Sequence, residues 1–236
     1  MRNILTIGGR QFRSYFNGPV AYIVICIVML TLGFFFWKTF FLFGRASARE
    51  MFRWLSLILV FALPALTMGL LAEEKRTGTI ELLITMPVTE AQVVVGKFLG
   101  VLGLYAVLLV LTVTYPISVS TLGDLDWGPV WSGYLGLFLQ GSAVLAIGLM
   151  ASSWTSNQLI ALFVAMTLSV FFWVLDKLLA LLPSSAASAL EWLSFDYHFQ
   201  SMARGVIDLR DLLFFFSVTL FALAVAFRAL ESRRWS

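Results

Sequence analysis

The chain has 236 residues, of which 60% are hydrophobic and only 12% are charged, and its mean hydropathy is +0.92. This composition is typical of a membrane protein with several spans and excludes an ordinary soluble domain. The formal net charge of +3 is too small to indicate a nucleic-acid partner, and the single cysteine excludes an intramolecular disulfide.

The pattern of apolar and basic residues in segment 1–16 predicts a short amphipathic helix at the membrane interface. Its apolar side chains can share one face, while Arg2, Arg10 and Arg13 reach the lipid headgroups. These arginines interrupt the apolar region that a cleavable signal peptide needs, so we expect none. Gly18-Pro19 is expected to end this helix before the first span.

Six apolar stretches are long enough to cross a hydrocarbon layer of about 30 Å as helices. They cover residues 19–42, 54–72, 93–121, 130–152, 158–182 and 211–230. We therefore predict an all-α fold with one transmembrane domain over residues 1–236, in contact with the lipid bilayer and with both termini on one side. Pro64 and Pro116 lie inside the second and third spans, where a proline kinks a helix.

Start signals precede two of the spans. Thr89 and Gln92 form a capping box at the start of the third span. Asp208 is a candidate N-cap of the sixth span, and Asp211 lies in its first turn, where a carboxylate complements the helix dipole. For the segment 183–210, between spans five and six, we predict one or two short helices at or in the membrane surface.

Small residues indicate close packing of helices. Gly96 and Gly100 have the GxxxG spacing, with Gly103 nearby, and four further glycines recur along the fourth span. The pattern leaves open whether the neighbouring helix belongs to the same chain or to a second copy.

The distribution of Lys and Arg gives a weak orientation. Cytoplasmic termini place nine of these residues inside and seven outside, a smaller margin than the positive-inside rule favours. The residues that oppose this orientation are Lys38, Arg45, Arg49 and Arg53 in the first outer loop. Either this loop meets an acidic partner or headgroup, or the orientation is reversed.

No phosphate loop, zinc-protease motif or nucleophile elbow occurs in the sequence, so no catalytic residue, bound cofactor or metal is expected. The single histidine, His198, stands beside Asp196 and has no converging partners, which favours a structural role. An ion-coupled carrier would place ionisable groups in mid-membrane, but Lys97, Asp176 and Lys177 lie near span ends.

A dense charged island, residues 73–87, separates the second and third spans. So many ionisable groups cannot lie in hydrocarbon, so they must form a surface at the water boundary. Gly78 permits a sharp turn there, and the apolar residues that follow can fill a groove in a soluble partner. The simpler interpretation is a solvated amphipathic loop helix without a partner.

The island and the following Gly96-Lys97-Phe98 resemble ABC-2-type permeases, which carry an E-x-x-x-G-T-x-E-x-L-x-x-x-P pattern before the third span. Stretches along nearly the whole chain, such as Gly18-Pro19-Val20-Ala21-Tyr22 and Arg204-Gly205-Val206-Ile207-Asp208, are similar to the gliding-motility permease subgroup.

This resemblance implies the transmembrane permease subunit of an ATP-driven exporter in a bacterial-type inner membrane, with cytoplasmic termini. It implies that residues 1–16 are an interfacial connecting helix, that segment 73–89 is the coupling helix region, and that segment 183–210 forms outer re-entrant helices. The implied ATPase-coupling residues are Glu73, Glu74, Lys75, Arg76, Gly78, Thr79, Glu81, Leu82, Leu83 and Pro87.

The resemblance also implies partners: a separate cytoplasmic ABC ATPase subunit, which holds ATP and magnesium, and a second permease copy in a homodimer. An auxiliary membrane subunit with an outer domain often accompanies the subgroup. The alternative function is a membrane scaffold or mechanotransmitter without bulk transport, which would use the same coupling segment.

Overall fold

The computed structural model describes residues 2–43, 48–79, 89–179 and 191–232. Every regular element in these ranges is a helix, as the composition predicts. In chain order the helices are α1 (Arg2–Asn17), α2 (Val20–Phe43), α3 (Arg49–Thr67), α4 (Ala72–Arg76), α6 (Glu90–Thr112), α7 (Thr114–Ser120), α8 (Trp127–Trp154), α9 (Gln158–Leu179), α11 (Phe195–Ala203) and α12 (Leu209–Glu231).

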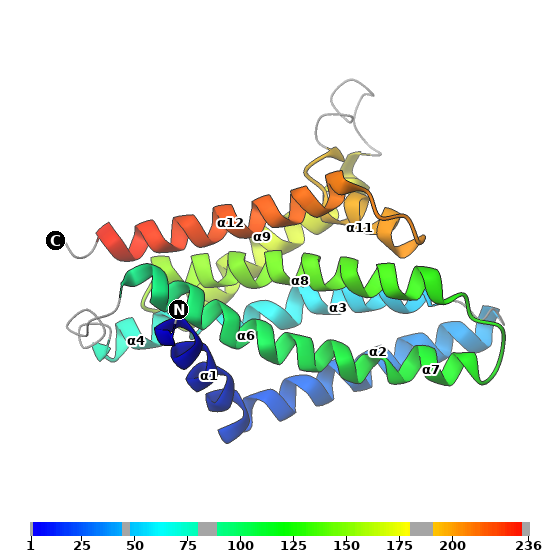
Figure 1. The fold of residues 1–236 in the computed structure, drawn as a ribbon, viewed down its shortest axis with the longest axis horizontal. Coiled ribbons are helices and arrows are strands. Elements are labelled where there is room, and N and C mark those ends of the chain that lie inside the picture. The colour runs from blue at the N-terminus through cyan, green and yellow to red at the C-terminus, as the bar shows by residue number, and fades with distance from the viewer. Residues whose placement is uncertain (1, 44–47, 80–88, 180–190, 233–236) are drawn as a thin grey trace.

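Within the described ranges, six helical stretches are long and apolar enough to cross a membrane, which confirms the predicted number. They form an elongated bundle in which α1 and the end of α12 lie toward the same end as α4 (Figure 1). The helix of the second span, α3, begins at Arg49 and ends at Thr67, so it lies five residues earlier in the chain than the predicted span 54–72 and carries charged residues in its first turns.

Helix α8 lies at the centre of the bundle and contacts α3, α6, α9, α11 and α12. Its glycines allow these close approaches. A Cβ built on Gly133 would overlap the Phe52 ring, and one on Gly148 would overlap the Thr67 side chain, so α3 packs directly on the α8 backbone. The glycines that recur along this span therefore pack against helices of the same chain.

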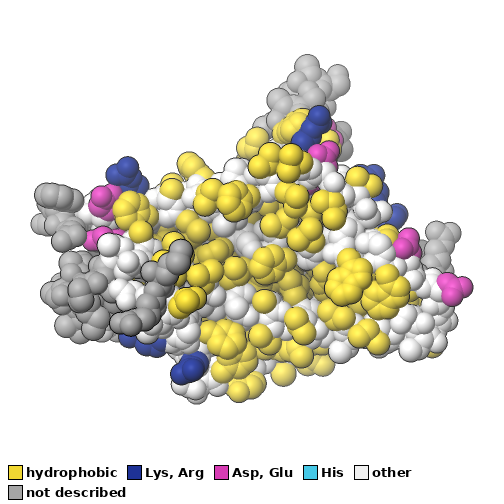
Figure 2. Space-filling view, viewed as in Figure 1, with side chains coloured by type: hydrophobic (Ala, Val, Ile, Leu, Met, Phe, Trp, Pro, Cys, Tyr) yellow, Lys and Arg dark blue, Asp and Glu magenta, His cyan; other side chains and the backbone are white. Residues whose placement is uncertain are grey.

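The outer helices α2, α9 and α12 expose many large apolar side chains. Examples are Leu30 on α2, Phe163 on α9 and Phe221 on α12, which are all more than 60% exposed. Figure 2 shows hydrophobic side chains over the middle of one face and charged ones toward its ends. Such a surface is unfavourable in water and favourable in lipid, which agrees with a membrane-spanning bundle.

The amphipathic helix α1 crosses α6 at the GxxxG glycines. A Cβ on Gly96 would lie 2.8 Å from Ile7 Cβ, and a Cβ on Gly100 would lie 2.6 Å from Gln11 Cβ. The Tyr15 hydroxyl of α1 also donates a hydrogen bond of 2.7 Å to the Leu66 carbonyl of α3. Burial raises the pKa of Tyr15, which keeps this donor protonated.

The predicted caps are confirmed. Gln92 N lies 3.3 Å from Thr89 Oγ1, and the capping box is complete. Arg210 N donates to Asp208 Oδ1 at 3.0 Å, so Asp208 caps α12. The third span is not one continuous helix, because α6 ends at Thr112 and Pro116 lacks the N–H that the Thr112 carbonyl would need.

Candidate functional site

The described part of the charged island, residues 73–79, begins within α4 and extends past its end. Helix α3 contains Pro64 and ends at Thr67, and the chain then turns through residues 68–71 before α4 begins. This turn leaves backbone groups without partners in the helix, so other elements must supply them.

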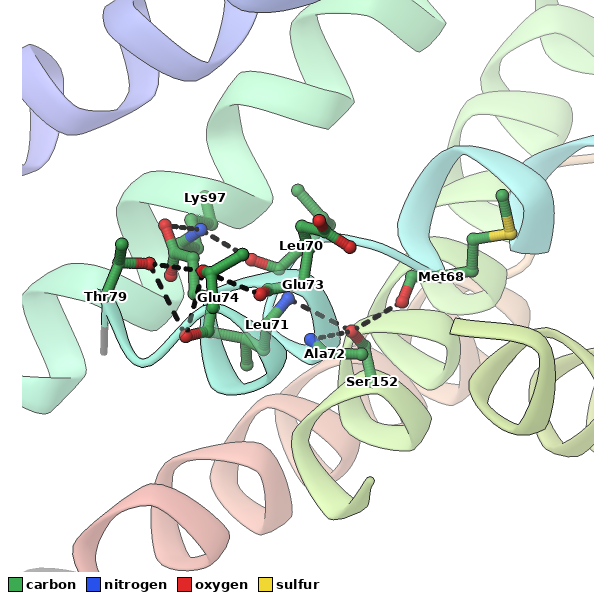
Figure 3. A network of polar contacts seen from close by, with 10 residues as sticks. Met68, Leu70, Leu71, Ala72, Glu73, Glu74, Thr79, Lys97 and Ser152 are labelled. Atoms are coloured by element: carbon green, nitrogen blue, oxygen red, sulfur yellow. Dashed lines mark hydrogen bonds and ion pairs between the residues drawn. The ribbon is translucent and has the colours of Figure 1, made fainter. Parts of the chain in front are cut away.

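Ser152 of α8 supplies three hydrogen bonds to this turn. Its hydroxyl oxygen accepts from the backbone N–H of Leu71 and of Ala72, each at 3.0 Å, and donates to the Met68 carbonyl at 2.9 Å (Figure 3). Ser152 is fully buried, so this side chain fixes where α4 starts.

We expect Ser152→Ala to lower the free energy of unfolding by about 2 kcal/mol, because two buried N–H donors lose their acceptor. Ser153→Ala is the matched control, since the Ser153 hydroxyl donates only to the Met150 carbonyl of its own helix. It should cost less than about 1 kcal/mol. Chemical unfolding of the two variants in detergent micelles checks the difference, and equal losses would contradict this role of Ser152.

Lys97 of α6 holds the same turn from the other side. Its ammonium lies 2.7 Å from Glu74 Oε1 and donates to the Leu70 carbonyl at 2.5 Å. The residue is only 3% exposed, so the charge is buried and depends on these partners. Figure 3 shows Lys97 and Glu74 pointing toward one another between α6 and α4.

Two further side chains of the island bind neighbouring helices. Gln158 at the start of α9 donates to Glu73 Oε2, and Lys75 donates to the Ser153 carbonyl near the end of α8. Glu73 also pairs with Arg76 at 2.6 Å, and the Arg76 side chain is 64% exposed. Of the four charged residues 73–76, Arg76 is thus the one that mostly faces outward.

After α4 the chain reverses at Gly78, whose φ of +72° favours glycine. Thr77 Oγ1 donates to the Glu73 carbonyl at 2.9 Å and lies 3.0 Å from Thr79 Oγ1. The sharp turn predicted from Gly78 is therefore present. The other predicted coupling residues, Glu81, Leu82, Leu83 and Pro87, lie outside the described residues.

The structure joins residues 73–79 to three long helices: α6 through Lys97, α8 through the Ser153 carbonyl, and α9 through Gln158. Ser152 of α8 holds the turn and the first residue of α4 just before this segment. The sequence pattern predicts only that Lys97 lies near a span end, and it gives no signal for the contacts of Ser152 or Gln158. A displacement of α4 would strain all three connections, so this arrangement can transmit force. Among the described residues no group of three or more His, Cys, Asp or Glu side chains could hold a metal ion.

At the other end of the bundle, His198 is buried and pairs with Asp211 rather than with its sequence neighbour Asp196. His198 Nδ1 lies 2.7 Å from Asp211 Oδ1, and Nε2 lies 3.0 Å from the Trp192 carbonyl. The imidazole also stacks on Phe214. The pair connects α11 to the start of α12, which agrees with the structural role expected for the histidine.

This architecture, with six candidate spans and a charged segment clamped at one end, is that of a polytopic membrane subunit. The profile described as ABC-2 family transporter protein matches residues 41–201, so the chain belongs to the ABC-2 transporter family. Membrane subunits of this family partner with ABC ATPases and generally lack ATPase activity themselves. No curated protein matches the chain.

Proposed function

We propose that this chain is the permease subunit of an ATP-driven exporter in a bacterial-type inner membrane, with cytoplasmic termini. A separate cytoplasmic ATPase subunit binds ATP and magnesium and docks on the coupling segment, residues 73–89. Two permease copies form the transporter, and the substrate path lies between them. Similarity to the gliding-motility subgroup also favours an auxiliary subunit with an outer domain.

The single observation that carries this proposal is the clamped position of α4. Glu74 is held by buried Lys97 of α6, and the turn before it is held by Ser152 of α8. A solvated loop helix without a partner would not need contacts to three spans. The geometry supports a segment that moves together with the spans around it.

In the proposed mechanism, ATP binding closes two ATPase subunits, and each closure displaces one coupling segment. The contacts of Glu73, Glu74 and Lys75 pass this displacement to α9, α6 and α8. The permease residues do no chemistry on the nucleotide. They convert closure of the ATPase into relative movement of helices at the interface between the copies.

Reversing charges in the island tests whether the ATPase docks there. We expect Arg76→Glu and Glu81→Lys to leave the permease folded but to abolish most of the stimulation of ATPase activity by the permease. Arg76 is exposed, and breaking its surface pair with Glu73 costs little stability. Binding and ATP turnover of the purified ATPase with each reconstituted variant are the measurements.

Arg228→Glu is the matched control, because Arg228 is also an exposed arginine paired three residues away, with Glu231 at 3.1 Å. It lies in the last turn of α12, and this end of α12 is at the same end of the bundle as α4 (Figure 1). We expect wild-type docking and turnover from this variant. If Arg76→Glu and Glu81→Lys also behave as wild type, the island is not the docking surface.

A second measurement distinguishes a transporter from a membrane scaffold or mechanotransmitter that moves no cargo. Proteoliposomes containing the permease and its ATPase are expected to move or extract cargo only when ATP is hydrolysed. ATP turnover stimulated by the permease without any movement of cargo would instead indicate a mechanotransmitter.

A further inference from the structure

A polar cavity of about 490 Å³ opens at the end of the bundle opposite α4. It lies between the start of α3, the end of α9 and helix α11, and each of the three contributes ionisable side chains. Phe199 and Ala203 of α11, both buried, also line it. The transport mechanism proposed above makes no use of this cavity.

Two of the cationic residues that oppose the positive-inside rule lie at this cavity. Arg49 and Arg53 belong to the first outer loop of the predicted topology, and both line it. Four cationic and three acidic side chains line it in total, so its formal charge is four minus three, or +1. A positive excess concentrated in a concave site favours an anionic group.

The charged side chains that line the cavity differ in whether they already have an ion-pair partner. Lys177 is paired with Asp196 at 3.2 Å, and its ammonium lies 3.6 Å from the centre of the Trp173 ring. In contrast, neither Arg53 nor Arg204 makes an ion pair with any residue that the structure describes. Both are exposed, and the Arg204 guanidinium donates only to neutral groups of α11, the Gln200 carbonyl at 3.2 Å and Ser201 Oγ at 3.5 Å.

We propose that this cavity binds a zwitterionic phosphate ester, with the phosphate held by Arg53 and Arg204 and the ammonium by Glu50 and Asp176. Arginine forms bidentate hydrogen bonds with phosphate oxygens, and a phosphodiester carries the single negative charge that balances the cavity. The cavity is also large enough for more than a phosphate group alone. A phospholipid headgroup and a soluble phosphate ester share this chemistry.

The test measures binding of glycerophosphoethanolamine to the purified full chain by calorimetry in detergent. We expect Arg53→Gln/Arg204→Gln to weaken binding at least tenfold, because each charged hydrogen bond that is lost weakens binding about tenfold or more. The control is Arg210→Gln, an exposed arginine near Trp192 that does not line the cavity. Inorganic phosphate and ethanolamine are each expected to bind at least tenfold more weakly than the ester.

Nanodiscs distinguish the two sources of the ligand. If the ligand is a lipid headgroup, nanodiscs of phosphatidylethanolamine should block binding of the soluble ester, whereas nanodiscs of an uncharged glycolipid should not. If the ligand is a soluble ester, its affinity should be equal in both lipids.

The proposal is overturned if the double glutamine variant binds the ester as tightly as the wild type, or if inorganic phosphate alone matches the ester. Thermal unfolding without ligand reports whether the variant is folded. Should it fail to fold, Arg53→Lys/Arg204→Lys keeps both charges but loses the planar guanidinium fork, and it should bind about tenfold more weakly. Unchanged binding by that variant would equally contradict the proposal.

Discussion

Lys97→Met, on α6, should destabilise the protein more than any single change within the island. The substitution leaves Glu74 without its cation and the Leu70 carbonyl without its donor. Breaking a buried ion pair by removing one partner costs about 3 to 5 kcal/mol, and we expect about 3 kcal/mol because Glu74 remains 23% exposed. Chemical unfolding in detergent micelles measures this loss.

The double variant Lys97→Met/Glu74→Leu tests whether the loss comes from the unpaired carboxylate. Replacing both charges by apolar groups of similar size is often nearly neutral, so we expect most of the stability to return. The two single variants complete a double-mutant cycle. An interaction energy close to zero would show that the pair does not stabilise α4.

The double variant also separates stability from coupling. It should fold and bind the ATPase yet show reduced stimulation of ATP turnover, because apolar contact is non-directional and does not fix the position of α4 on α6 as the ion pair does. Full stimulation in a stable double variant would show that this pair does not transmit force, while leaving the docking surface itself intact.

Gly141→Ala is the second change with a large expected effect. A Cβ at this position would overlap the ring of Tyr105, which is fully buried and donates a hydrogen bond of 2.5 Å to the Leu137 carbonyl. Displacing the Tyr105 ring overpacks the core and breaks its hydrogen bond to the Leu137 carbonyl. We therefore expect the free energy of unfolding to fall by about 3 kcal/mol. Thermal unfolding and the yield of folded protein in detergent check this value.

Gly9→Ala is the matched control, because it changes the same residue type within a helix but meets no atom within 4 Å. Alanine has the higher helix propensity, so this variant should gain up to about 1 kcal/mol. A second variant, Gly141→Ala/Tyr105→Leu, should recover part of the loss by removing the ring. A loss in Gly141→Ala no larger than that in the control would show that α6 and α8 can separate without cost.

The number and approximate positions of the spans could be predicted because they depend on local composition. Runs such as Val20–Phe43 are apolar over the length that a bilayer requires, and the caps at Thr89 and Asp208 depend on residues at most three positions away. The glycine spacing likewise predicted close packing, although it could not show that α1 is the partner of Gly96.

The contacts of the candidate site could not be predicted from the sequence. Lys97 and Glu74 are 23 positions apart, and Ser152 is about 80 positions from the turn that it caps. A lysine near a helix end is commonly interfacial, and a serine in a membrane helix usually bonds to its own backbone. Only the packing of α4 against α6 and α8 distinguishes these residues from the common case.

The crossing of α1 over α6 constrains the order of events during biosynthesis. Helix α1 leaves the ribosome before α6, and the glycine surface that receives it is made about 90 residues later, which at roughly 5 to 20 residues per second takes about 5 to 18 s. Before α6 is made, the contacts open to α1 are those with α2 and α3, such as the hydrogen bond from Tyr15 to the Leu66 carbonyl. Helix α1 therefore reaches its packing position on α6 only after the residues of the first three spans have been synthesised.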